Sequence, residues 1–167
     1  MKTKIQIKSI LGNVLFELEK EDNTIKDTVI EARRQKANLS GADLLGAKID
    51  DIEKLKEYFW IIPEEGSFIG WKKLENNCIA KLQIPAKAKR TCNLMSRKCR
   101  AEYVKVLGIW NKDGEKIQSA QNHTSDKKLL YVSGKTVKPD SYDDSPFVDC
   151  SHGIHFFLIR HEAEGWQ

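Results

Sequence analysis

The sequence predicts an α+β fold in which a mainly antiparallel sheet forms a larger C-terminal domain. Segments that alternate apolar and polar residues recur along the chain, glycine-containing tight turns separate some of them, and only short stretches have helical periodicity. The 167 residues are 40% apolar and 31% charged, which is typical of a globular protein and excludes a disordered or collagen-like chain. We expect one main core with a smaller attachment.

The N-terminal segment predicts a β-hairpin followed by a helix. Residues 4–10 and 14–19 alternate apolar and polar side chains, and the Gly-Asn pair between them favours a two-residue hairpin turn. Thr24 and Asp27 have the spacing of a capping box, which predicts a helix over 24–36. Its apolar face would consist of Ile25, Val29 and Ala32.

A short repeat with a period of five residues follows over 37–51. The small residue of each unit is Ala37, Ala42 or Ala47, and the large residue two places later is Leu39, Leu44 or Ile49. This pattern resembles the pentapeptide-repeat family, which forms a quadrilateral β-helix with four units in each coil. Three units are less than one turn, so the resemblance implies a vestigial pentapeptide coil that acts as a connector.

A linker helix is predicted after the repeat, with Ile52, Leu55 and Phe59 on one face and a proline at its end. The chain is therefore expected to divide into an N-terminal part over 1–65, with hairpin, helix, repeat and linker helix, and an α+β ligand-binding domain over 66–167. An incomplete repeat leaves apolar edges that a second subunit could cover, so we expect a homo-oligomer.

Three segments of the C-terminal domain predict strands, because they alternate or are rich in β-branched and aromatic residues: 77–84, 101–110 and 153–159. An Asp-Gly turn joins the second of these segments to a strand over 116–120. A last short helix is predicted over 162–164.

Several stretches of this domain match a known family pattern, namely 69–73, 84–85 with 88–90, 97–101, 137–140 and 150–157. They resemble an uncharacterised domain that is found behind pentapeptide repeats in phage and other viral genomes. The resemblance implies a viral accessory protein and supplies no chemistry.

Positive charge is concentrated in the middle of the chain. The net charge is +4 overall, but it is −2 over 1–69 and +8 over 70–100. Cationic side chains combined with hydroxyl groups in one loop are well suited to phosphate. We therefore interpret the C-terminal domain as a non-enzymatic binding domain for a phosphate-rich nucleotide, such as a cyclic nucleotide or an ADP-ribose derivative. Together with the viral resemblance, this predicts a phage counter-defence protein that sequesters an immune signal.

The predicted ligand site combines cations, one aromatic residue and one histidine. The phosphate clamps would be Arg97, Lys98 and Arg100. The secondary cations would be Lys72, Lys87, Lys89 and Arg90. Trp71 would stack on a base, and His152, in a Ser-His-Gly turn, would donate a hydrogen bond.

Other interpretations of these residues remain open at this point. The positive segment could be a solvated loop that keeps the protein in solution, and Trp71 could belong to the core. Cys150, His152 and His155 carry zinc-type ligand atoms, but alternation along a strand places residue 155 on the opposite face, so we expect no metal. The acidic stretch 140–149 could pair with the basic segment when no ligand is bound.

Two further function classes are alternatives. An ADP-ribosyltransferase-like or nucleotide-cleaving enzyme would use His152 together with Tyr103, Tyr131 or Glu162, which rests on analogy of fold. A protein-interaction adaptor would inhibit a host factor through the hairpin and the repeat.

Composition and motifs argue against several other classes. No apolar run approaches the roughly 18 residues that span a bilayer, and no signal peptide is evident, so we expect a cytoplasmic protein without a membrane partner. The four cysteines form no CxxC pair and are expected to be thiols. Duplex DNA is not expected because the chain lacks a long basic stripe. The segment 133–136 lacks the first glycine of a P-loop, and we expect no cofactor.

Overall fold

The computed structural model describes residues 1–39, 42–44, 56, 59–94, 96–123 and 128–166. The chain divides into two compact units. The smaller unit contains 1–61, 93–97 and 146–149, and the larger unit contains 62–92, 98–145 and 150–167. A helix with the length and apolar character needed to cross a bilayer does not occur among the described residues.

The smaller unit begins with a hairpin and a helix. β1 (Lys2–Lys8) and β2 (Val14–Glu21) pair antiparallel around a tight turn that contains glycine. α1 (Ile25–Arg34) starts at a capping box, in which the Thr24 hydroxyl accepts from the backbone N–H of Asp27 and the Asp27 carboxylate accepts from the backbone N–H of Thr24. The predicted hairpin and capping box are confirmed, but the two-residue Gly-Asn turn is wrong, because β1 ends at Lys8 and residues 9–13 connect it to β2. α1 ends two residues earlier than predicted.

The predicted repeat lies only partly among the described residues. Leu39, Ala42 and Leu44 are buried, and Ala42 forms an isolated bridge with Ser9. The other repeat residues beyond position 39, and most of the predicted linker helix, lie outside the described residues.

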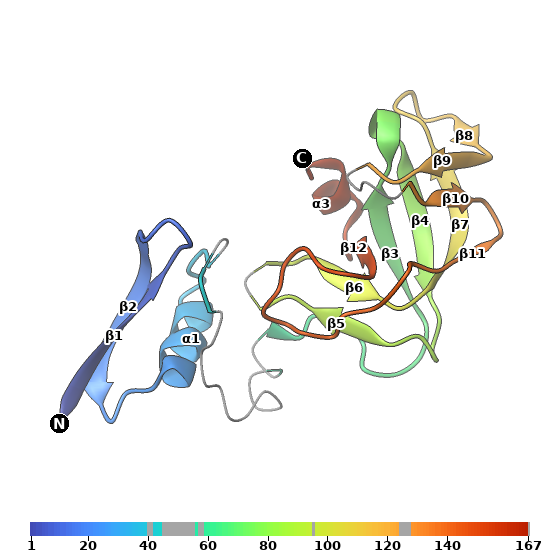
Figure 1. The fold of residues 1–167 in the computed structure, drawn as a ribbon. Coiled ribbons are helices and arrows are strands. Elements are labelled where there is room, and N and C mark those ends of the chain that lie inside the picture. The colour runs from blue at the N-terminus through green and yellow to red at the C-terminus, as the bar shows by residue number, and fades with distance from the viewer. Residues whose placement is uncertain (40–41, 45–55, 57–58, 95, 124–127, 167) are drawn as a thin grey trace. The chain divides into compact units, whose positions relative to one another are not determined.

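Strands dominate the larger unit (Figure 1). One sheet consists of β3 (Phe68–Lys73), β4 (Ile79–Ile84), β7 (Val104–Trp110), β8 (Lys116–Ile117) and β11 (Thr136–Val137). A second consists of β5 (Arg90–Cys92), β6 (Cys99–Ala101) and β12 (Ile154–Phe156), and a third of β9 (Ser119–Gln121) and β10 (Leu130–Val132). The first sheet has the order β11-β7-β4-β3 with β8 on β7, and the second has the order β12-β6-β5.

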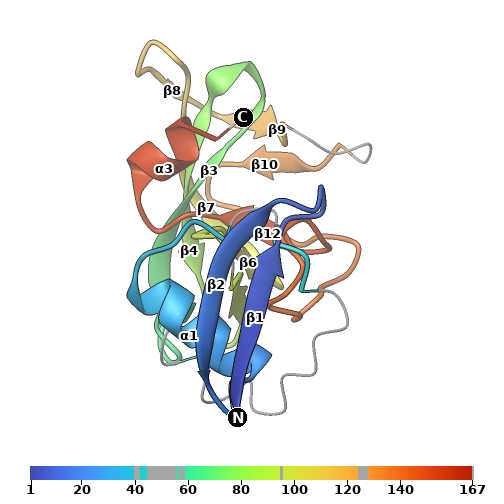
Figure 2. The same ribbon diagram turned by 90° about the vertical axis from the view of Figure 1, so that its left-hand side faces the viewer.

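All described strand pairs are antiparallel, as the predicted α+β class requires. The helical elements described in the larger unit are a 3-10 turn, η1 (Glu75–Asn77), and a short helix, α3 (Arg160–Glu164). Figures 1 and 2 show α3 and the β9–β10 pair toward the same end of β3. These elements flank the region in which the site lies.

The predicted strand boundaries need several corrections. The segment predicted as one strand over 116–120 is divided between β8 and β9, which belong to different sheets, and the strand predicted over 153–159 is limited to Ile154–Phe156. The segment predicted as one strand over 101–110 belongs to two sheets, because the chain leaves β6 at Glu102, whose backbone N–H donates to the carbonyl of Lys89 at 2.9 Å. The strand predicted to start at residue 77 starts at Ile79, because Asn77 has a positive φ of 56° that a strand does not accommodate.

The contact between β3 and β12 depends on Gly70. A Cβ atom at this position would lie 2.6 Å from Cδ2 of Phe156 and 3.0 Å from Cδ1 of Ile84, which is closer than van der Waals contact allows. The next residues form an isolated bridge, in which Trp71 and Phe157 exchange backbone hydrogen bonds of 2.7 and 2.8 Å. The glycine therefore lets the two strands approach closely enough to bring their ends together.

We expect the substitution G70A to destabilise the larger unit by about 1–3 kcal/mol, because the added methyl group overlaps the ring of Phe156. Chemical denaturation monitored by tryptophan fluorescence measures this difference. The matched control is G165A, where the added Cβ would lie at an ordinary 3.5 Å from its nearest neighbour, the backbone oxygen of His161. Equal effects of the two substitutions would contradict the role given to Gly70.

Candidate functional site

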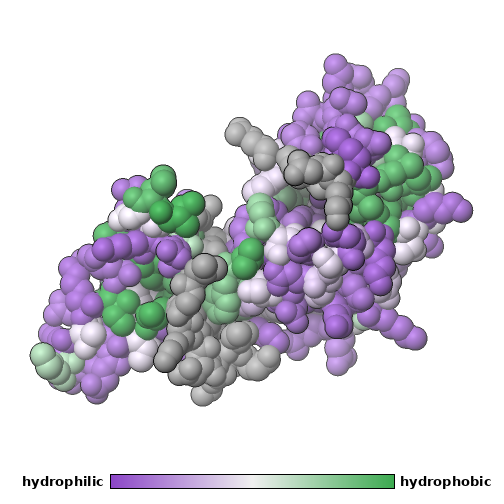
Figure 3. All heavy atoms as spheres, in the orientation of Figure 1, coloured by the Kyte–Doolittle hydropathy of each residue, from purple (hydrophilic) through white to green (hydrophobic). Residues whose placement is uncertain are grey.

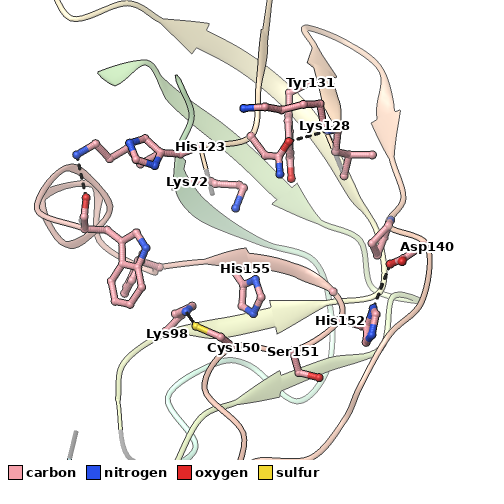
Figure 4. Close-up of a pocket in the computed structure, with 17 residues that line it drawn as sticks. Lys72, Lys98, His123, Lys128, Tyr131, Asp140, Cys150, Ser151, His152 and His155 are labelled. Atoms are coloured by element: carbon pink, nitrogen blue, oxygen red, sulfur yellow. Dashed lines mark hydrogen bonds and ion pairs between the residues drawn. The ribbon is translucent and has the colours of Figure 1, made fainter. Parts of the chain in front are cut away.

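A pocket of about 850 Å³ lies within the larger unit (Figure 4). This volume is in the range of small-molecule binding sites. The charged and histidine side chains that line it are Lys72, Lys73, Lys98, Lys128, His123, His152, His155 and Asp140. The remaining lining residues include Tyr131, Phe157, Trp166, Asn122, Cys150 and Ser151. The pocket therefore combines ammonium groups with aromatic walls.

Positive charge outweighs negative charge in this lining. Four lysines face a single carboxylate, that of Asp140. This carboxylate accepts from the backbone N–H of Ser141 at 2.8 Å and lies 3.2 Å from Nδ1 of His152 at the rim. The electrostatic field inside the pocket favours an anion.

Alternation along β3 directs Lys72 into the pocket and Trp71 away from it. Successive side chains of a strand point to opposite faces. The ring of Trp71 packs beside Trp110 at a centroid distance of 6.3 Å and lies beneath the cation of Arg160. The amine of Lys72 instead lies 6.0 Å from the ring centroid of Tyr131 and points toward the middle of the pocket (Figure 4).

Burial changes the acid–base properties of Lys72. Desolvation, with a contribution from the nearby cation of Lys98, lowers the pKa of Lys72 to about 8. Among the residues that the structure describes, no acceptor lies within hydrogen-bonding distance of its Nζ atom. An anion in the pocket would therefore be its first charged partner of opposite sign.

Lys98 and Lys73 hold the aromatic wall in position. Lys98 is 4% exposed, its Nζ donates to Sγ of Cys150 at 2.9 Å, and the same ammonium lies 4.2 Å from the ring centroid of Trp166. Lys73 Nζ donates to the backbone carbonyl of Trp166 at 2.8 Å. The two cations thus fix the indole that follows α3.

His155 is a neutral imidazole in the floor of the pocket. Burial lowers its pKa to about 3, and Lys72, Lys98 and Arg100 add to this effect. Its Nε2 atom is buried and has no hydrogen-bond partner in the described part of the chain. Unpaired buried polar atoms are uncommon in folded proteins, and a bound ligand would supply the missing partner.

The rim of the pocket is attached to β6 by Arg100. This side chain is 1% exposed, and its guanidinium donates to the backbone carbonyls of Asp143 and Ser145. The Asp143 carboxylate accepts from the Ser151 hydroxyl and the Ser145 N–H, and these hydrogen bonds lower the pKa of Asp143. The acidic stretch does pair with the basic segment, mainly through its carbonyl groups.

The structure brings together only some of the residues predicted as a ligand site. Lys72, Lys98 and His152 line the pocket. The predicted residues outside its lining are Trp71, Lys87, Lys89, Arg90, Arg97 and Arg100. The prediction that the cations of 87–100 converge on one ligand site is therefore wrong. Lys98 is the one cation of that segment that lines this pocket.

The predicted cations outside the pocket have other surroundings. Lys87 and Lys89 are exposed. The guanidinium of Arg90 donates to backbone carbonyls, which are those of Pro63, Gly66, Pro85, Ala86 and Ala88. Arg97 is exposed and belongs to the smaller unit. These arginines therefore have contacts unrelated to the pocket.

Sequence reasoning missed the contribution of the β9–β10 connection. This connection supplies Asn122, His123 and Lys128, and β10 supplies Tyr131. The sequence did contain a local signal for this contribution. His123 and Lys128 flank a polar segment that lies between two short segments of alternating apolar and polar residues. Trp166 was missed because only the packing of α3 against β3 places it in the wall.

The chemistry of the pocket does not match a metal centre or the predicted transferase arrangement. No group of three or more His, Cys, Asp or Glu residues suitable for a metal ion occurs in the described part of the chain. Tyr131 and His152 line the pocket, whereas Tyr103 and Glu162 do not. The geometry instead fits the binding of an anion that carries an aromatic or apolar part.

We expect the substitution K72M to raise the melting temperature by about 2–4 °C, because it removes a poorly solvated charge while keeping the length of the side chain. A thermal melt followed by circular dichroism measures this shift. The substitution K73M serves as the control and should lower the melting temperature, since it deletes the hydrogen bond to Trp166. A lower melting temperature for K72M would contradict the electrostatic description of the pocket.

Comparisons with known proteins place the larger unit in a family. No curated protein and no solved structure matches the chain. A family model described as "Family of unknown function (DUF5758)" matches residues 58–163, which is more than half of the chain and includes most of the pocket lining. The chain therefore belongs to the family of unknown function DUF5758.

Proposed function

We propose that the pocket binds a small phosphate-bearing ligand of the nucleotide type and that the protein sequesters this ligand without converting it. The observation that carries the proposal is the excess of ammonium groups over carboxylates in the lining, where four lysines face Asp140 alone. Lysine is a common phosphate ligand that acts as a point charge, so several lysines around one hollow favour a multiply charged anion.

The aromatic wall supports a ligand that is more than an inorganic ion. Trp166, Tyr131 and Phe157 line the same pocket as the lysines. A base or another flat group can stack on an aromatic ring while neighbouring cations neutralise its phosphates. A pocket of this size also suits a small molecule better than a DNA duplex, which requires an extended basic surface.

The biological setting that we propose is phage counter-defence in the host cytoplasm. In this role the protein would remove a cyclic nucleotide or an ADP-ribose-derived signal from an immune pathway of the host cell. The support for this setting is the resemblance of the C-terminal domain to a viral domain that follows pentapeptide repeats, combined with a pocket suited to phosphate.

We expect the double substitution K72M/K128A to weaken the binding of ATP or ADP-ribose at least tenfold, because both ammonium groups line the pocket. Isothermal titration calorimetry measures this change. The matched control K87A/K89A removes the same amount of charge from exposed positions outside the lining and should change the affinity less than twofold. Equal losses in the two variants would mean that only the overall charge attracts the ligand.

A second experiment, on the purified wild-type protein, separates binding from catalysis. Mass spectrometry of small molecules released from the purified, denatured protein identifies an intact ligand or a processed product. An intact ligand supports sequestration. A product, together with loss of turnover in H152A, supports the enzymatic alternative and contradicts the proposal.

A second candidate function, assembly or adaptor binding through the hairpin, is favoured by one observation. Ile10 and Leu11 in the turn between β1 and β2 are 76% and 83% exposed. Figure 3 shows hydrophobic residues at this turn, whereas hydrophilic residues cover most of the visible face of the larger unit. Exposed neighbouring apolar side chains of this size are typical of interaction surfaces.

We expect the double substitution I10S/L11S to convert an oligomer of this protein into a monomer, as measured by size-exclusion chromatography with light scattering. The control L130S removes an apolar side chain that is 53% exposed on the larger unit, and it should leave the oligomeric state unchanged. A wild-type protein that is monomeric at micromolar concentration would contradict self-assembly. Adaptor binding would then be the function that remains for this turn.

A further inference from the structure

Lys72 differs from the other lysines of the pocket in what its amine contacts. Lys73 donates to a backbone carbonyl, Lys98 donates to a thiol sulfur, and Lys128 forms an ion pair with Glu75 at 3.6 Å. The Lys72 amine lies over the ring of Tyr131, and its Nζ atom points into the hollow (Figure 4). The amine is therefore accessible to a ligand and free of competing hydrogen bonds within the described residues.

Two features of the surroundings favour chemical reactivity of this amine. It is desolvated, and it shares the pocket with another ammonium group, that of Lys98. These are the conditions under which enzymes keep a lysine amine neutral and nucleophilic near neutral pH. A pKa of about 8 leaves about a tenth of the amine neutral at pH 7 and about half at pH 8.

We propose that Lys72 forms a Schiff base with a phosphate-bearing aldehyde held in the pocket. This inference rests on the proposed function, because the neighbouring lysines must first bind the phosphate. A ribose with a free anomeric carbon belongs to this class when it carries a phosphate, since its ring opens to an aldehyde. The inference thus narrows the ligand from any nucleotide to one that ends in a reducing sugar or another carbonyl group.

The reaction needs no external oxidant or reductant. The nitrogen lone pair of Lys72 attacks the carbonyl carbon, a C–N bond forms, and the carbonyl oxygen takes a proton to give a carbinolamine. Loss of the hydroxyl group as water, with the remaining nitrogen proton released, gives the C=N bond. His155, whose Nε2 atom is buried without a partner in the described residues, lies in the same pocket and can accept a hydrogen bond from the carbinolamine hydroxyl.

The test uses pyridoxal 5′-phosphate as a phosphate-bearing aldehyde, added below one equivalent to the full chain and trapped with borohydride. Peptide mapping by mass spectrometry should find Lys72 modified at least tenfold more than any other lysine. Raising the pH from 7 to 8 should increase the rate about fivefold as the amine loses its proton. ADP-ribose, trapped in the same way, should modify the same residue.

Five controls make the result specific. Pyridoxal without the phosphate should lose the preference for Lys72, and excess pyrophosphate should suppress the labelling. The variant K72R keeps a cation but cannot form the imine, so it should lose the adduct, whereas K87R, at an exposed position outside the pocket lining, should keep it. Because arginine is larger, K72M provides a second variant without the amine.

The outcomes distinguish this inference from the proposed function. Labelling spread evenly over the surface lysines, or an unchanged rate in K72R and K72M, overturns the Schiff base. If ATP still binds the wild-type protein and K72M/K128A loses that binding, the pocket nevertheless binds nucleotides. If neither ATP nor pyridoxal 5′-phosphate binds, both proposals fall.

Discussion

The close approach of β3 and β12 at Gly70 is the constraint on which the larger unit depends. Because position 70 has no side chain, the ring of Phe156 occupies the space beside it, and Trp71 and Phe157 form a backbone bridge one residue further. This bridge places the end of β3 beside β12, so that Lys72 and His155 face one hollow. The positions of the pocket lysines thus follow from a packing contact made by uncharged residues.

The pocket concentrates groups whose burial opposes folding. The cation of Lys98 contributes to the lowered pKa of Lys72, and both lysines lower the pKa of His155, which remains neutral and without a hydrogen-bond partner in the described residues. Arrangements of this kind are expected where function rather than stability selects the residues. Arg90 and Arg100, outside the pocket lining, instead donate to backbone carbonyls.

Local signals in the sequence predicted local structure well. The capping box of Thr24 and Asp27 and the hairpin before it are confirmed, because both depend on residues close in the chain. The site was predicted only in part, since its wall comes from segments far apart in the sequence. The high density of positive charge identified 70–100 as a candidate segment, but charge density does not show where each side chain points. Lys98 lines the pocket, whereas Arg100, two residues later, binds the loop at the rim of the pocket.

The attachment of that rim by Arg100 has a further consequence. Its guanidinium binds the carbonyl oxygens of Asp143 and Ser145, which do not gain protons under conditions that neutralise carboxylates. A loop tethered through aspartate side chains alone would detach in an acidic compartment, because each tether would lose its charge. The attachment of the border to β6 through Arg100 therefore persists in acid, whereas the hydrogen bond that the Asp143 carboxylate accepts from Ser151 weakens once that carboxylate gains a proton.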